Sequence, residues 1–207
     1  MSTHSYYQAL PEQSRLFQRL RTDRALHTLY ADLTLLGGGP LHLSDLDPSE
    51  IDETLDYLTE DRAAFKSRAE AERTLSELRQ ELKQACTSFP GIEDRAAYFE
   101  QVHRELETLL PRELSRVGYD LAEPLVQVLL YGDDLLAPAL GDYRNSPLRL
   151  NAAPVVQEGA RALFALKPEV LDRAIEDVDF PAEDYERRRS VYQEAARRGE
   201  VVIVLTS

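Results

Sequence analysis

Apolar positions recur at intervals of three and four residues along most of the chain, the spacing of helices that bury one face. A short pattern follows Asp47, with a first-turn proline and a first-turn acid that are typical of a helix start. A longer pattern covers 62–88, is interrupted at Pro90-Gly91, and resumes over 93–110. We therefore predict a short helix after Asp47 and an antiparallel helical hairpin over 62–88 and 93–110.

The two ends of the chain carry further elements. Two short helices are predicted upstream of Gly37-Gly38-Gly39-Pro40. These glycines close a helix and lack a following Lys-Ser/Thr, so they do not match a phosphate-binding loop. Downstream, 148–150 alternates as a short strand, Asn151 can cap the next helix, and later helices begin at Pro168 and after Pro181. The apolar, β-branched terminus VVIVLTS predicts a buried strand at the end of the chain.

Length and composition indicate a globular protein with its own core. The 207 residues fit one domain, and the 43% hydrophobic and 29% charged residues are typical of neither disordered nor membrane proteins. No stretch approaches the roughly 20 apolar residues of a membrane span, and the N-terminus lacks the layout of a signal peptide. A single cysteine, Cys86, excludes an intrachain disulfide and a multi-cysteine zinc site. We expect one cytoplasmic domain over 1–207.

Charge is the next distinguishing feature. The net charge is −13, from 37 acidic and 24 basic residues, and the acids cluster between Asp45 and Asp61 and again between Glu169 and Glu186. Such a surface repels phosphate backbones, so a nucleic-acid partner is not expected. It permits a basic protein partner, and it equally fits solvated helix faces that maintain solubility.

A search for catalytic motifs is negative. The four histidines form none of the HxxxH, HxH or HExxH arrangements, and no GxSxG motif is present. Cys86 lies on the apolar face of the predicted hairpin, which favours a buried, inert thiol. Arg187, Arg188 and Arg189 point in directions about 100° apart on a helix, and nearby acids predict a self-neutralising surface there. We expect no metal and no cofactor.

The long irregular segment 131–146 is the best candidate for a binding site, because long loops in compact domains are often functional. Ordinary turn chemistry explains its Asp and Asn residues equally well. A site would form where this loop meets His27 or the terminal strand. The candidate ligand-binding residues are Asp133, Asp134, Asp142, Tyr143, Arg144 and His27.

The run LLYGDD, a loop, PLRLNAAPVVQEGARAL, a charged helix with SVYQEAARRGE and the closing VVIVL resembles the C-terminal half of the YfbM-like family, a bacterial domain of unknown function. The resemblance covers residues 125–206, and SYYQAL is similar to that family's opening strand. It implies an α+β fold whose N- and C-terminal strands share one small sheet, and it implies no activity. The chain lacks the family's usual tryptophan before a leucine-histidine pair, whose nearest remnant is Ala25-Leu26-His27. Residues from about 45 to 115 have no counterpart and are interpreted as a helical elaboration.

These observations predict a helix-rich α+β single domain, with a small sheet holding both terminal strands and an acidic helical-hairpin insertion. The leading functional hypothesis is a non-enzymatic binding or protein-interaction domain with an acidic surface, which uses its acidic helices or the 131–146 loop to hold a partner such as a basic protein. The alternatives are a small, hydrolase-like enzyme with a site near 131–146, and a structural homodimer. No membrane partner is expected, and both a monomer and a homodimer remain open.

Overall fold

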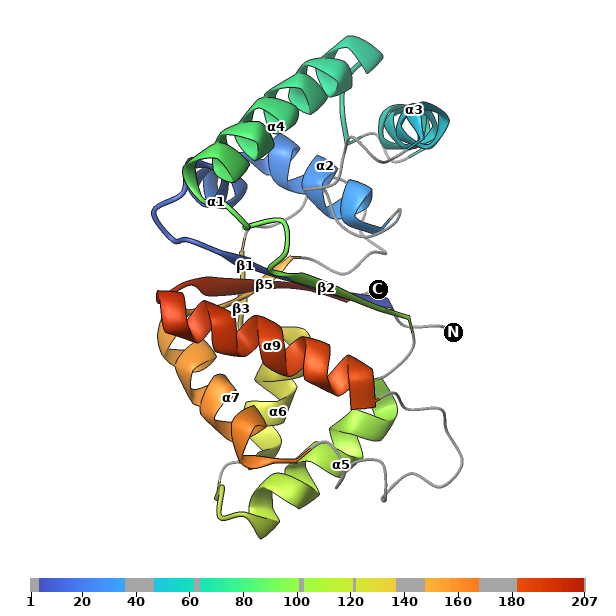
Figure 1. Cartoon of the computed structure of the whole chain (residues 1–207). Coiled ribbons are helices and arrows are strands. Elements are labelled where there is room, and N and C mark those ends of the chain that lie inside the picture. The colour runs from blue at the N-terminus through green and yellow to red at the C-terminus, as the bar shows by residue number, and fades with distance from the viewer. Residues whose placement is uncertain are drawn as a thin grey trace.

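The computed structural model describes residues 4–35, 47–61, 64–100, 103–120, 122–136, 148–167 and 182–206. One five-stranded antiparallel sheet lies between two layers of helices (Figure 1). The predicted helix-rich α+β fold with a small sheet is therefore confirmed. The glycine run at 37–39, the helix start at Pro168 and most of the 131–146 loop lie outside the described residues.

The sheet has both ends of the chain at its centre. Its strand order is β2-β1-β5-β4-β3, and each neighbouring pair is antiparallel. The register of β1 and β5 runs from Ser5 opposite Thr206 to Leu10 opposite Val201. The strands are β1 (His4–Leu10), β2 (Ala96–Glu100), β3 (Asp134–Leu135), β4 (Arg149–Asn151) and β5 (Val201–Thr206).

The first helical layer covers one face of the sheet. Alternate side chains such as Tyr6, Leu10 and Ile203 point into its core. The prediction of a helix after Asp47 is confirmed, because the Asp47 side chain accepts a 2.8 Å hydrogen bond from the backbone nitrogen of Ser49. The layer consists of α1 (Arg15–Thr22), α2 (Arg24–Leu35), α3 (Pro48–Asp56) with the π-helical turn η2 (Tyr57–Asp61), and α4 (Arg68–Ser88).

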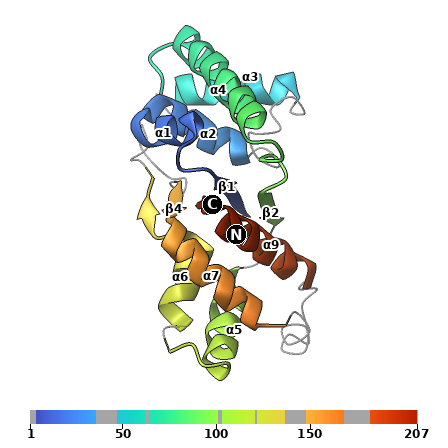
Figure 2. The same cartoon turned by 60° about the vertical axis from the view of Figure 1, so that its left-hand side comes forward.

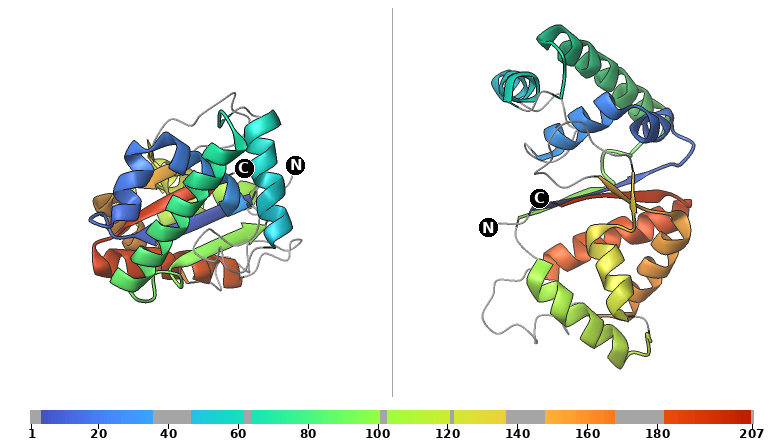
Figure 3. Two further views of the ribbon diagram at one scale, coloured as in Figure 1. Left: turned by 90° about the horizontal axis from the view of Figure 1, so that it is seen from above. Right: turned by 180° about the vertical axis from the view of Figure 1, so that it is seen from behind.

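The second helical layer covers the opposite face, and Figures 2 and 3 show both layers from other sides. Tyr7, Ala9, Val202 and Val204 point into this second core. Since both faces are covered, the first five residues of β5 are buried, which explains its unbroken apolar run. The layer consists of α5 (His103–Arg116), α6 (Ala122–Tyr131), α7 (Ala153–Ala165) and α9 (Ala182–Arg198).

The prediction that the second arm of the hairpin is helical from residue 93 is wrong. Residues Ala96–Glu100 form strand β2, which pairs with β1, and the helix of this arm begins only at His103. Ala97 and Phe99 contact the second core, whereas Ala96 and Tyr98 pack on the first, which is the two-residue alternation of a strand. The segment therefore contributes to the sheet and is not a purely helical elaboration.

A buried ion pair joins the residues that directly precede β2 and β5. The Arg95 guanidinium bonds the Glu200 carboxylate, and both side chains are almost fully buried. Arg95 also donates a 2.9 Å hydrogen bond to the carbonyl oxygen of Pro90. The bond to Pro90 fixes the turn between α4 and β2, and the ion pair ties that turn to the start of β5.

Candidate functional site

The structure does not bring the predicted ligand-binding residues together. Asp133 directly precedes the two-residue edge strand β3 and Asp134 begins it, and both side chains are exposed. His27 is completely buried in α2, within the first helical layer. Asp142, Tyr143 and Arg144 lie outside the described residues.

His27 has the environment of a neutral core histidine. Its Nδ1 lies 3.3 Å from the carbonyl oxygen of Leu20, which can only accept, so Nδ1 carries the proton. Burial lowers the pKa of His27 to about 4, and the bond to Leu20 opposes that shift. An uncharged imidazole without solvent contact cannot exchange protons with a ligand in the loop.

Asn151 holds the described start of the 131–146 loop in place. We predicted that its side chain caps α7, but α7 begins after Ala152 without a side-chain cap. The Asn151 amide instead accepts a 3.0 Å hydrogen bond from the backbone nitrogen of Asp133 and donates to the Val128 carbonyl at 3.0 Å. It also donates to the Tyr192 hydroxyl at 2.7 Å. This buried amide therefore joins α6, the start of β3, β4 and α9.

An open groove of about 730 Å³ lies between α6 and α7. Its floor is formed by the partly exposed side chains of Leu125, Val128 and Val155, with two prolines at the helix starts. Three exposed carboxylates stand around it, and we call this feature the acidic groove. The residues lining the acidic groove are Gly118, Tyr119, Asp120, Pro124, Leu125, Val128, Asp133, Pro154, Val155 and Glu158.

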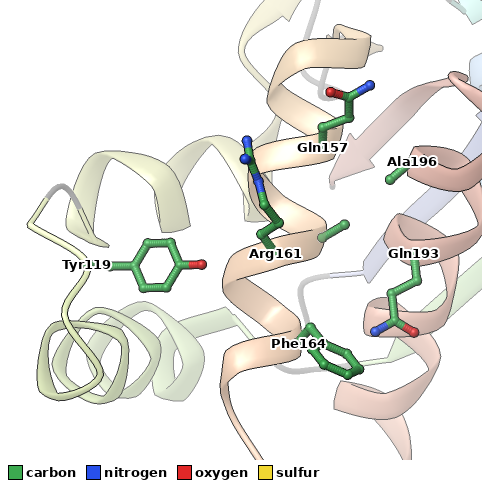
Figure 4. A pocket seen from close by; sticks show the side chains of 7 residues that line it. Tyr119, Gln157, Arg161, Phe164, Gln193 and Ala196 are labelled. Atoms are coloured by element: carbon green, nitrogen blue, oxygen red, sulfur yellow. The ribbon is translucent and has the colours of Figure 1, made fainter.

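A second hollow of about 650 Å³ lies on the other side of α7, against α9. Figure 4 shows Tyr119 reaching toward α7 from the turn before α6, opposite Gln193 and Ala196 of α9. Phe164 is 63% exposed here, and the guanidinium carbon of Arg189 lies 4.9 Å from the centre of its ring. Tyr119 lines both hollows, so the two are adjacent around α7.

The acidic helix α3 is partly neutralised within the fold. Arg68 of α4 contacts Asp52 at 2.5 Å, Glu72 at 3.1 Å and also the Asp56 carboxylate. Two of the carboxylates predicted to form an acidic face on α3 are therefore paired with a base. The acidic groove is a better-defined candidate, because it combines charge with an apolar floor.

The arginine triplet is only partly a self-neutralising surface. Arg189 pairs with Glu186 at 2.9 Å, as predicted, but Arg188 is completely buried. The sequence signal for this burial is that Arg188 shares a helical stripe with Tyr185 and Tyr192, three and four residues away, and both are buried. The charge of the triplet alone does not reveal this burial, whereas the tyrosine spacing does.

In the described part of the chain, no three His, Cys, Asp or Glu side chains lie together in a way that could hold a metal ion. None of the described helices is long and apolar enough to cross a membrane. No protein-family model, curated protein or solved structure matches this chain. The resemblance to the YfbM-like family therefore stays a prediction.

Proposed function

We propose that this chain is a non-enzymatic protein-interaction domain that holds a basic segment of a partner protein in the acidic groove. The supporting observation is the combination of a partly exposed apolar floor with three exposed carboxylates at the rim, Asp120, Asp133 and Glu158. Glu158 also pairs with Arg161 at 2.8 Å, an exposed contact that a partner cation can replace at little cost.

The floor and the rim have different physical roles. Covering Leu125, Val128 and Val155 contributes affinity in proportion to the apolar area removed from water, about 25 cal/mol per Å². The carboxylates select lysine or arginine on the partner and speed its approach, an effect that the net charge of −13 strengthens. The expected partner segment therefore presents one or two apolar side chains flanked by bases.

Hydrogen bonds hold the backbone on both sides of the groove, and such preorganisation lowers the entropic cost of binding. Asn151 fixes the backbone at Asp133 and the end of α6, as described above. The Tyr192 hydroxyl donates a 2.9 Å hydrogen bond to the Leu129 carbonyl and so ties α9 to the same helix. A partner would meet a surface whose backbone is already in place.

The test is affinity capture from host lysate at low and high salt, with mass spectrometry of the retained proteins. The groove variant carries Asp120→Asn, Asp133→Asn and Glu158→Gln. The control variant carries Glu50→Gln, Glu53→Gln and Glu60→Gln, exposed positions on α3 and η2 that remove the same charge away from the groove.

We expect the wild type and the control to retain a basic protein that salt releases, and the groove variant to retain about tenfold less. If all three proteins retain the same material, or none retains a basic protein, the proposal fails. The hydrolase-like and homodimer alternatives stay predictions, since the described residues offer no observation that favours either.

A further inference from the structure

Arg188 occupies the interior of the second helical layer, where α9 packs against β1 and β2. Its side chain is 0% exposed. The guanidinium carbon lies 4.9 Å from the centre of the Tyr7 ring and 4.4 Å from that of Phe99. The two rings meet edge to face, with centres 5.6 Å apart, so Arg188 contacts the junction between them.

None of the three guanidinium nitrogens of Arg188 meets hydrogen-bond geometry with a described residue, and the Tyr7 hydroxyl is the nearby polar group whose contact with Arg188 opposes the rise in the Tyr7 pKa. Aromatic rings stabilise the positive charge, but they do not replace the acceptors that the N–H groups lost on leaving water. The Tyr7 hydroxyl donates its own proton to the Leu130 carbonyl at 2.9 Å. A negatively charged hydrogen-bond acceptor would stabilise such a buried guanidinium.

Four other buried charged side chains in the described chain are paired with an opposite charge. Glu81 lies 3.0 Å from Arg15, Glu113 lies 2.7 Å from Arg116, and Glu200 pairs with Arg95. Arg188 differs from these four side chains, because the structure records no salt bridge for it among the described residues.

Three tyrosine hydroxyls lie within electrostatic reach of Arg188. Burial raises the pKa values of Tyr7, Tyr131 and Tyr192, and in each case the charge of Arg188 opposes that shift. The Glu107 carboxylate raises the pKa of Tyr131 further. Arg188 is thus surrounded by aromatic rings and tyrosine hydroxyl groups.

We propose that Arg188 anchors a binding site for a small organic carboxylate at the junction of α9, β1 and β2. A planar guanidinium binds a carboxylate through two parallel hydrogen bonds, and one positive charge matches one negative charge. The ring walls of Tyr7 and Phe99 suit the apolar part of such an acid better than a strongly hydrated phosphate. Because β2 is an edge strand, entry from that side breaks no strand pairing.

The experiment follows the side-chain Nε–H resonance of Arg188 in the full ¹⁵N-labelled chain during titration with sodium acetate. Sodium chloride and sodium phosphate at equal ionic strength are the comparison titrations. Arg188→Lys assigns the resonance by its loss. Arg197→Lys, on the exposed face of the same helix, is the matched control.

We expect acetate to shift the Arg188 resonance to saturation and to raise the thermal unfolding midpoint, with little effect of chloride. R188K should weaken acetate binding, followed by its backbone resonances, about tenfold or more, and R197K should leave it unchanged. If R188K does not fold, the Arg188 Nε–H resonance is assigned in the wild type through its connection to the backbone resonances of α9, which separates it from the buried Arg95, and the titration is interpreted without the variant.

Three results would overturn the proposal. A resonance that no anion moves would mean that the aromatic rings alone hold Arg188. Equal shifts with chloride would reduce the effect to ionic strength. A response to phosphate without a response to acetate would exclude a carboxylate as the ligand.

Discussion

The strongest quantitative prediction concerns His27 and the dependence of stability on pH. In the folded protein the pKa of His27 is lowered to about 4 by burial, whereas the ordinary value is 6.5. Between these values the unfolded chain binds a proton that the folded chain does not. Stability from this group is therefore fully present above the unfolded pKa and is lost as the pH falls toward the folded pKa.

The magnitude follows from the two pKa values. At about pH 7 both states are mostly neutral, and at about pH 5 the unfolded imidazole is almost fully protonated while the folded one is not. The difference lowers the free energy of unfolding by ~2 kcal/mol over that range. For a protein that is stable by about 5–15 kcal/mol, this is a large fraction of the total.

The assay is urea unfolding of the wild type and of His27→Gln at the two pH values. Glutamine has no ionisable group and keeps a donor for the Leu20 carbonyl. Carboxylates such as Glu200, whose pKa is raised by burial, titrate in both proteins and cancel in the comparison. We expect the variant to lose ~2 kcal/mol less than the wild type on acidification. Equal losses in the two proteins would refute the assignment of a buried, neutral His27.

Further stability predictions use urea unfolding at neutral pH. Gly132→Ala should lower the free energy of unfolding by about 2–3 kcal/mol, since φ of Gly132 is +79° and a Cβ there would lie 2.4 Å from the Cβ of Arg149. Gly118→Ala should lower it by only about 1 kcal/mol, because φ of Gly118 is +96° but no atom lies within 4 Å of the new Cβ. Equal costs would mean that the contact is relieved elsewhere. Glu200→Leu should cost about 3 kcal/mol or more, because it leaves the other charge of its ion pair buried alone; an unchanged midpoint would contradict this. Asn151→Ala should lower the free energy of unfolding by about 2 kcal/mol, because it leaves buried backbone and hydroxyl groups without their hydrogen-bond partner. It should also weaken capture of the partner by the acidic groove. Loss of stability without loss of capture would show that the groove does not depend on Asn151.

Much of the candidate site depended on contacts that no local pattern reports. The sequence indicated the loop and Asp133, but the groove exists because α6 and α7 pack beside each other and leave Leu125 and Val155 partly exposed. Asn151 is of a residue type that commonly caps helices and lies just before α7, but its side chain bonds Tyr192 because α9 packs beside it. His27 was a ligand candidate by residue type, and its burial among α-helices removed it from the loop.

The sequence by itself determined the elements whose signals are local. The β-branched terminus predicted β5, Asp47 and Pro48 predicted the start of α3, and Gly199, with φ +68°, predicted the end of α9. Such signals depend on a few neighbouring residues, so they can be interpreted without knowing what the element packs against.

The tertiary structure alone decided that β2 is a strand and that Arg188 is buried. Residues Ala96–Glu100 fit a helical spacing as well as a strand, and they become a strand because β1, about ninety positions earlier in the chain, offers backbone partners. Arg188 is buried because α9 lies across the rings of Tyr7 and Phe99, which belong to two different strands. Both outcomes depend on residues distant in sequence, and a local pattern of polar and apolar positions contains no information about such partners.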